Sequence, residues 1–125
     1  MKSLVIAALL SLSVFCSSVV AGELSGRYLL NTNGFKGYID LNISGSSVSG
    51  EMVWFVDANG QRTQLSAKIK KGRISRTDKS IYIYFVRVGN PQEYHGWFSF
   101  DKSMIAGYFG GYKNSNIKYP WVATK

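Results

Sequence analysis

The sequence contains few of the residues that form cross-links, metal sites or catalytic triads. Its 125 residues include one cysteine, one histidine and two prolines. A zinc site needs three or four histidine, cysteine or acidic ligands at suitable spacing, so zinc is disfavoured. No loop resembles a calcium-binding loop, and so few prolines exclude collagen-like and proline-rich proteins. We therefore expect no metal and no cofactor.

Groups for catalysis are equally scarce. A nucleophile–base triad needs a histidine that a third group orients, and His95 is the one histidine available. Glu93 is placed to orient it, because residues two apart share one face of a strand. No nucleophile signature accompanies the pair. The sequence favours a strand histidine paired with a surface carboxylate, in a protein that is not an enzyme.

The cysteine lies in an N-terminal segment with the composition of a secretory signal. Lys2 supplies a positive charge, residues 4–15 form an apolar run broken by serines, and small residues lead to Ala21. This pattern predicts a cleaved signal peptide over residues 1–21. The run is too short for a membrane span, which needs about 20 apolar residues. A lipoprotein would use Cys16, and bulky Phe15 before it disfavours that alternative.

Residues 22–125 would then form one exported domain without a thiol or a disulfide. A single hydrophobic core can hold a domain of about 100 residues. Small secreted eukaryotic domains depend on disulfides, so their absence favours a bacterial protein that is periplasmic or secreted.

Basic residues outnumber acidic ones. Fifteen lysines and arginines stand against seven aspartates and glutamates, which gives a formal charge of +8. A basic surface attracts nucleic acid, anionic lipid, anionic polysaccharide or an acidic protein. An exported protein rarely meets nucleic acid, so we expect none. The basic residues between positions 68 and 76 are expected to form a solvated hairpin end.

Short alternating runs separated by turn residues recur along the expected domain, without helical periodicity. Asn59-Gly60 is the strongest hairpin signal, since both central residues of a type I′ turn need positive φ. We expect Leu65 and Ile69 to point inward, and the polar residues 71–79 to form a turn and a connection. The runs predict eight strands, at residues 26–32, 35–43, 48–56, 63–70, 80–88, 93–100, 104–112 and 117–124.

Eight short antiparallel strands with sequential connections predict an all-β fold, an up-and-down β-barrel. A closed sheet of eight strands can hold one small ligand, and closure removes exposed edges. The alternative is a β-sandwich, which usually needs Greek-key crossings. Glycines beside large residues recur in the strands, and we expect them to relieve strand coiling and make room for neighbouring rings.

Four segments resemble the avidin and streptavidin family of eight-stranded barrels. Residues 24–28 (LSGRY) resemble the opening Gly-x-aromatic strand, and residues 48–52 (VSGEM) resemble the start of the third strand. Residues 106–111 (AGYFGG) and 121–124 (WVAT) are similar to the Gly–aromatic strand and the late tryptophan strand. The segments cover under half of residues 22–125, and they imply a related barrel.

The resemblance also implies roles for individual residues. Trp121 matches a tryptophan in the wall of the family's biotin cage, and Asp101 and Ser103 fall near its polar ligand contacts. The family has a Tyr and a Ser for the ureido group where this chain has Met52 and Trp54. The family's C-terminal tail, with an acidic ligand contact, is not matched. Biotin binding is therefore not implied.

Aromatic residues with polar tips are abundant, with three tryptophans and eight tyrosines. Such side chains suit pockets and interfaces. We predict a non-enzymatic binding protein that holds a small hydrophobic or amphipathic ligand in the mouth of the barrel. The candidate ligand-binding residues are Trp54, Trp97, Tyr108, Trp121, Asp101 and Ser103.

Two other interpretations stay open. A periplasmic or secreted protein-binding module, such as an inhibitor or an immunity protein, would have a packed interior and exposed aromatic residues. Its positive charge favours an acidic protein partner. A self-associating structural protein would form a homo-oligomer through residues 80–88, because this run is apolar on both faces. The small-ligand carrier, by contrast, predicts a cavity lined by tryptophan, tyrosine and a few polar groups.

Overall fold

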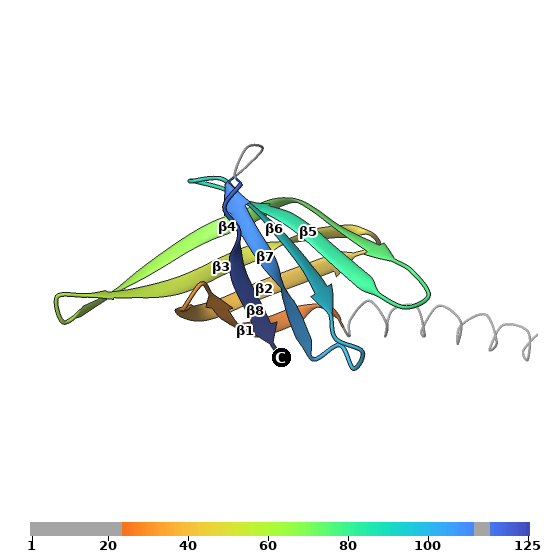
Figure 1. Ribbon diagram of the computed structural model, residues 1–125, viewed down its shortest axis with the longest axis horizontal. Coiled ribbons are helices and arrows are strands. Elements are labelled where there is room, and N and C mark those ends of the chain that lie inside the picture. Colours follow the sequence, from red (N-terminus) through yellow and green to blue (C-terminus); the bar gives the residue numbers. More distant parts are fainter. Residues whose placement is uncertain (1–23, 112–115) are drawn as a thin grey trace, which may run out of the picture.

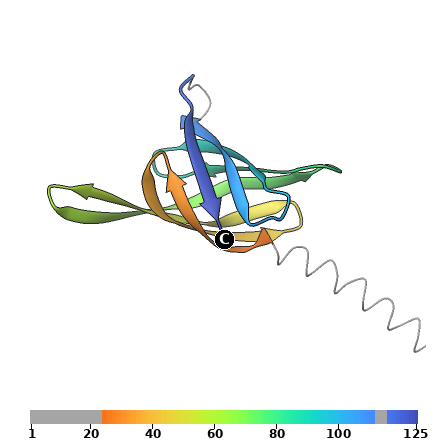
Figure 2. The same cartoon turned by 60° about the horizontal axis from the view of Figure 1, so that its bottom comes forward.

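The computed structural model describes residues 24–111 and 116–125, which form a closed antiparallel β-barrel (Figure 1). Each strand pairs with its neighbours in the sequence, and β8 returns to lie beside β1 (Figure 2). The strands are β1 (Gly26–Thr32), β2 (Phe35–Ser44), β3 (Ser47–Ala58), β4 (Gln61–Arg76), β5 (Ile81–Arg87), β6 (Gln92–Phe98), β7 (Met104–Gly111) and β8 (Tyr119–Thr124). The predicted up-and-down barrel is confirmed, and the sandwich alternative is wrong.

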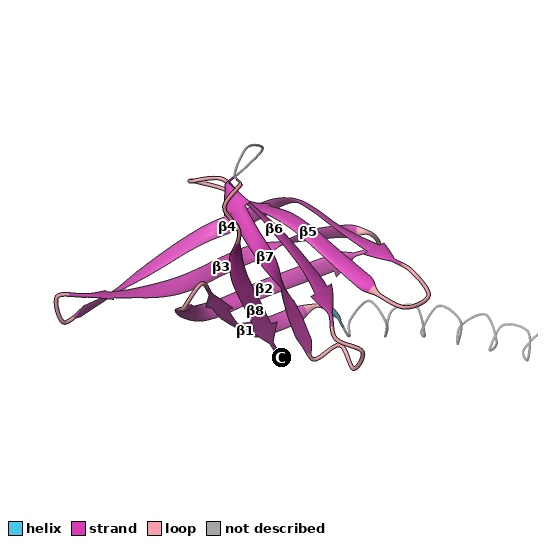
Figure 3. Ribbon diagram, in the orientation of Figure 1, coloured by secondary structure: helices cyan, strands magenta, loops and turns pink. Residues whose placement is uncertain are grey.

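Strands account for most of the described chain (Figure 3). Within that part, no helix has the length and apolar character needed to cross a membrane. The predicted cleavage site after Ala21 lies outside the described residues, so export stays a prediction.

Strand β4 is longer than predicted. The expected turn after Lys70 is wrong, because β4 continues through a β-bulge between Lys70 and Arg73. Lys71 takes a positive φ of 55° there. A bulge adds one residue to one strand and so changes which positions face inward. After the bulge Ile74 is buried, and the alternation that marks this strand in the sequence is interrupted at that point.

Strands β3 and β4 extend past the barrel as a two-stranded arm (Figure 1). Strand β2 pairs with β3 only as far as Trp54, and the ladder between β4 and β5 starts at Ile69. Asn59 and Gly60 have φ values of 54° and 75° at the tip, as the hairpin signal predicts. Leu65 lies on this arm and is 40% exposed, so the expectation that it packs inside is wrong.

Aromatic rings fill the middle of the barrel. Tyr94 stacks on Phe85 and Phe109 with ring centroids 5.0 and 4.6 Å apart. Trp121 packs edge-on against Phe85 and Tyr94 at 5.8 and 5.4 Å. The hydroxyl of Tyr94 bonds that of Thr32 at 2.9 Å, so its polar tip is satisfied inside the barrel. This layer separates the two ends of the interior.

One end of the barrel is closed by the chain that leads into β1. Leu24 is fully buried, and the Tyr28 hydroxyl donates to its carbonyl oxygen at 2.6 Å. Ile43, Val48 and Ile74 are buried with it in the same core. The opposite end carries the turns after β1, β3 and β5.

Candidate functional site

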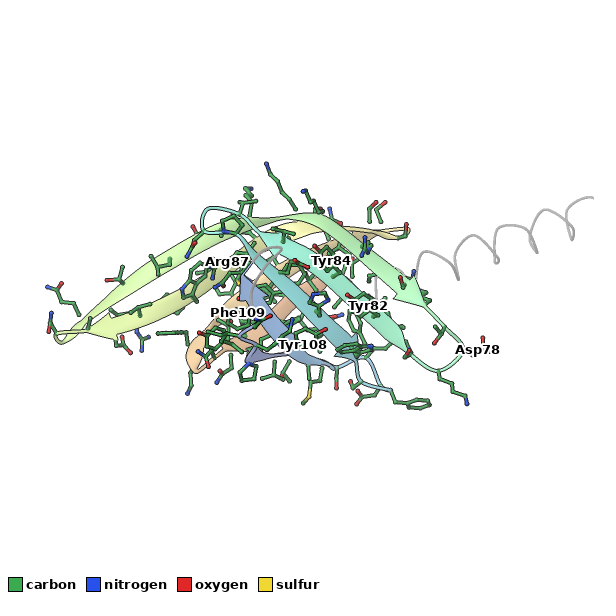
Figure 4. The ribbon with its side chains drawn as sticks, turned by 45° about the horizontal axis from the view of Figure 1, so that its top comes forward. Asp78, Tyr82, Tyr84, Arg87, Tyr108 and Phe109 are labelled. Carbon is green, nitrogen blue, oxygen red and sulfur yellow. The ribbon has the colours of Figure 1, made fainter. Side chains whose placement is uncertain are left out.

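The end of the barrel opposite Leu24 contains a cavity of about 260 Å³, which we call the mouth. Its lining residues, apart from one in the first turn, continue the inward alternation of their strands. Arg87 and Phe109 lie at the ends of β5 and β7, far from Asp78 in the turn before β5 (Figure 4). The lining consists of Thr32, Asn33, Phe35, Trp54, Arg87, Gln92, Phe109 and Tyr119.

The floor of the mouth is the aromatic layer of the core. Phe109 lines the cavity and stacks on Tyr94, while Thr32 lines it and bonds the Tyr94 hydroxyl. Burial raises the pKa of Tyr94, so this hydroxyl stays neutral at physiological pH. The mouth is therefore a shallow, firmly supported site and not a channel through the barrel.

Besides Thr32 and Asn33, two longer polar side chains, Arg87 and Gln92, line the mouth. The guanidinium carbon of Arg87 lies 4.8 Å from the centre of the Trp54 ring, and Nη2 donates to the Asn90 carbonyl at 3.2 Å. Oε1 of Gln92 is buried and has no hydrogen-bond partner among the described residues. The mouth thus combines several rings with one cation and one unsatisfied amide oxygen.

A larger hollow of about 590 Å³ lies outside the barrel, between the β1–β2 turn and the arm. Phe55, Asp57 and Arg62 line its arm side. Arg62 pairs with Asp57 at 3.1 Å, and both side chains are well exposed. Because its walls face water and its arm side carries an exposed ion pair, this hollow is a weaker candidate than the mouth.

The outer surface of β5, β6 and β7 carries a second group of rings, which we call the aromatic wall: Tyr82, Tyr84, His95, Trp97 and Tyr108 (Figure 4). Register places Tyr82 opposite Trp97, and His95 between Tyr84 and Tyr108. Trp97 is 43% exposed. Arg73 lies 4.6 Å from the Tyr84 ring centre, and Lys118 lies 4.8 Å from that of Tyr108.

His95 is held at the centre of the aromatic wall. Its Nδ1 bonds the Tyr82 hydroxyl at 2.5 Å, and its Nε2 lies 3.5 Å from Glu93, so the expected pairing with Glu93 is confirmed. Burial lowers the pKa of His95 despite Glu93, and burial raises the pKa of Tyr82. Both groups are therefore neutral at neutral pH. That the protein is not an enzyme stays a prediction.

The predicted ligand-binding residues fall in four places. Trp54 lines the mouth, while Trp97 and Tyr108 lie together on the aromatic wall, 6.1 Å apart. Trp121 is 2% exposed in the core, where Nε1 donates to the His95 carbonyl at 2.9 Å. The last two candidates, Asp101 and Ser103, lie in the β6–β7 turn at the closed end of the barrel, where Ser103 Oγ donates a hydrogen bond to Asp101.

Sequence reasoning missed Arg87 and Gln92. Both continue an inward alternation, since Arg87 follows Phe85 by two positions and Gln92 precedes Tyr94 by two. The signal in the sequence is a charged or amide residue in inward register beside a turn. It is ambiguous, because a position beside a turn also favours a solvated side chain.

Comparisons of the chain with protein families, with curated proteins and with solved structures found no match. The resemblance to the avidin family stays a prediction. What the chain binds is therefore argued from its own geometry.

Acid should destabilise the fold through the β6–β7 turn. Oδ1 of Asp101 accepts bonds from Ser99 Oγ, Ser103 N and Ser103 Oγ, which lower its pKa from 3.8 to about 2. Because the folded pKa lies below the unfolded one, this stabilisation is complete above about pH 4 and is lost as pH falls toward about 2. Asp101→Asn should flatten the dependence of Tm on pH in this window, measured by circular dichroism.

The control for this experiment is Asp78→Asn in the exposed β4–β5 turn. It should retain the full loss of Tm between about pH 4 and pH 2. An equal slope in the Asp101→Asn variant and the wild type would show that the turn does not contribute.

Proposed function

We propose that this chain is a binding protein that holds a small amphipathic ligand in the mouth of its barrel. The observation that carries this proposal is a cavity of about 260 Å³ lined by inward-facing rings and by four polar side chains, which include one arginine and one glutamine. Ligand sites are typically concave and mostly apolar, with a few convergent polar groups. The volume lies just below the roughly 300–1,000 Å³ of drug-sized sites, so the ligand is small.

The apolar part of the ligand would lie on Phe109 and against Trp54, above the aromatic layer. Its polar part would face Arg87 and Gln92, which line the same cavity. For drug-sized ligands the affinity is bounded near 0.3 kcal/mol per non-hydrogen atom, and smaller ligands can exceed this, so a molecule of about 13 such atoms should bind with micromolar to millimolar affinity. Weak binding of this order fits a shallow site.

Trp54→Ala should remove most of this binding, because it takes away the largest ring that lines the mouth. Isothermal titration with 2-naphthamide and 1-octanol, a flat and a chain-like neutral probe, measures it. Wild type should bind one equivalent of at least one probe, and Trp54→Ala should weaken that binding by about fivefold or more.

Trp97→Ala is the matched control, since it removes the same residue type from the aromatic wall. It should leave the affinity for both probes unchanged. Failure of both probes to bind wild type would contradict the proposal, as would an equal loss in the two variants.

The aromatic wall supports a second candidate function, the binding of an acidic protein partner. Its exposed Trp97, beside two tyrosines and flanked by Arg73 and Lys118, has the composition of an interface centre. A complex formed in the native compartment should then be lost on Trp97→Ala and kept on Trp54→Ala. A complex that survives Trp97→Ala would contradict this candidate.

A further inference from the structure

The charge of the mouth comes from a single side chain. Among the described residues that line it, Arg87 is the only one that is charged. This side chain is half-buried, and no described carboxylate forms an ion pair with it. A cation removed from water without an acidic partner lowers stability, and an anion supplied by a ligand would relieve that cost.

Arg87 is also oriented for a ligand. Its guanidinium lies over Trp54 at 4.8 Å, which holds the group at the cavity wall. One nitrogen donates to the Asn90 carbonyl at 3.2 Å. A guanidinium carries five N–H donors in a planar fork, so donors remain for a carboxylate that approaches from the mouth.

Gln92 supplies a second polar point in the same cavity. Its Oε1 is buried without a hydrogen-bond partner, which is costly in a folded protein. A carboxamide offers an acceptor and two donors and can exchange them by rotation. A carboxylate near Arg87 only accepts hydrogen bonds, so it can bond Gln92 through the amide nitrogen once the amide has rotated, and the apolar body is left to the rings.

We propose that the mouth is selective for small organic acids, with an apolar and preferably flat body and a carboxylate bound by Arg87. This inference rests on the proposed function of the mouth. An organic cation is disfavoured for two reasons. The positive charge of Arg87 repels it, and Arg87 already covers a face of Trp54 on which a cation would otherwise bind. The positive charge of the whole chain, +8, also attracts anions rather than cations.

Three probes of the same shape test the charge preference: 2-naphthoate, 2-naphthamide and 2-naphthylmethylammonium. Isothermal titration at neutral pH and low salt measures their affinities for the wild-type protein. The carboxylate should bind about tenfold tighter than the amide, and the ammonium should bind most weakly. Arg87→Gln should abolish the preference, so that the carboxylate and the amide bind this variant with similar affinity.

Arg73→Gln is the matched control, because it removes the same charge from the outer wall. It should keep the tenfold preference for the carboxylate. Circular dichroism checks that each variant is folded. If Arg87→Gln does not fold, Arg87→Lys replaces it, and this variant should keep a reduced preference because it retains the charge but loses the planar fork.

The outcomes separate this inference from the function on which it rests. Equal affinity of wild type for 2-naphthoate and 2-naphthamide would overturn the preference for acids while the mouth remains a binding site. An equal loss in Arg73→Gln and Arg87→Gln would overturn the role of Arg87. Binding of none of the three probes, together with no binding of 1-octanol, would overturn the proposed function itself.

Discussion

The Gly107→Ala variant should lose a large part of its free energy of unfolding. A Cβ atom at Gly107 would lie 1.8 Å from the His95 carbonyl oxygen and 2.7 Å from the Gly96 Cα, both on β6. These contacts are with backbone, so no side-chain rotation relieves them. Separating β6 from β7 would break the ladder between them. We expect a cost on the order of 3 kcal/mol or more, against a total stability of about 5–15 kcal/mol.

Ala106→Val is the control for this experiment. Residue 106 precedes Gly107 on β7 but is exposed, so valine adds more atoms there without a clash. Denaturation in urea, followed by circular dichroism, should show a large loss in Gly107→Ala and a change within about 0.5 kcal/mol in Ala106→Val. A Gly107→Ala variant as stable as wild type would mean that β6 and β7 do not approach this closely.

Trp121→Ala should destabilise the barrel by about 3–5 kcal/mol. Its ring is almost fully buried against Phe85 and Tyr94, and it covers Gly96, where a Cβ would lie 2.7 Å from the Trp121 Cζ2 atom. Removing the indole leaves a cavity and takes the Nε1 donor from the His95 carbonyl. Part of the loss is thus a hydrogen bond to a partly buried carbonyl oxygen.

The same variant separates two roles for Trp121. If this residue were a cage wall, as the avidin resemblance implies, Trp121→Ala would weaken ligand binding more than folding. Its burial favours the opposite, a large loss of stability with binding affected only through the fold. Trp54→Ala is the comparison, because Trp54 is half-buried at the mouth and should change stability less. Urea denaturation and titration of 2-naphthamide on both variants measure the two effects.

The number of strands, their order and most of their turns could be predicted from the sequence. Alternation along β2 identifies an apolar face and a polar face, and a slip of one residue would bury Asp40. Gly96 confirms that a strand glycine can make room for a ring, here that of Trp121. Gly107 is required for a different reason, because the backbones of β6 and β7 approach closely there. No local sequence pattern reveals that approach.

The length of β4 and the arm could not be predicted. The bulge at Lys71 changes which positions of β4 face inward, in the middle of the strand. The alternation of apolar and polar residues is therefore interrupted where the strand itself continues. Alternation gives the face of a residue but not its depth along the barrel. Leu65 and Ile69 have the same parity, yet Leu65 lies on the arm and Ile69 in the core.

The candidate site was predicted only in part, for the same reason. Residue type selected three tryptophans, and the fold distributes them to the mouth, the outer wall and the core. Only Trp54 lies at the cavity. Arg87 completes that site because β5 ends at the mouth, which depends on how the strands are staggered around the barrel. Local sequence does not specify that stagger.

The location of a bound probe tests the mouth site most directly. Nuclear Overhauser contacts between 2-naphthoate and isotope-labelled protein show which side chains the probe touches. We expect contacts to the ring protons of Trp54 and Phe109, and none to Trp97 or Tyr108. Contacts confined to Trp97 and Tyr108 would place the binding site on the aromatic wall and contradict a site in the mouth.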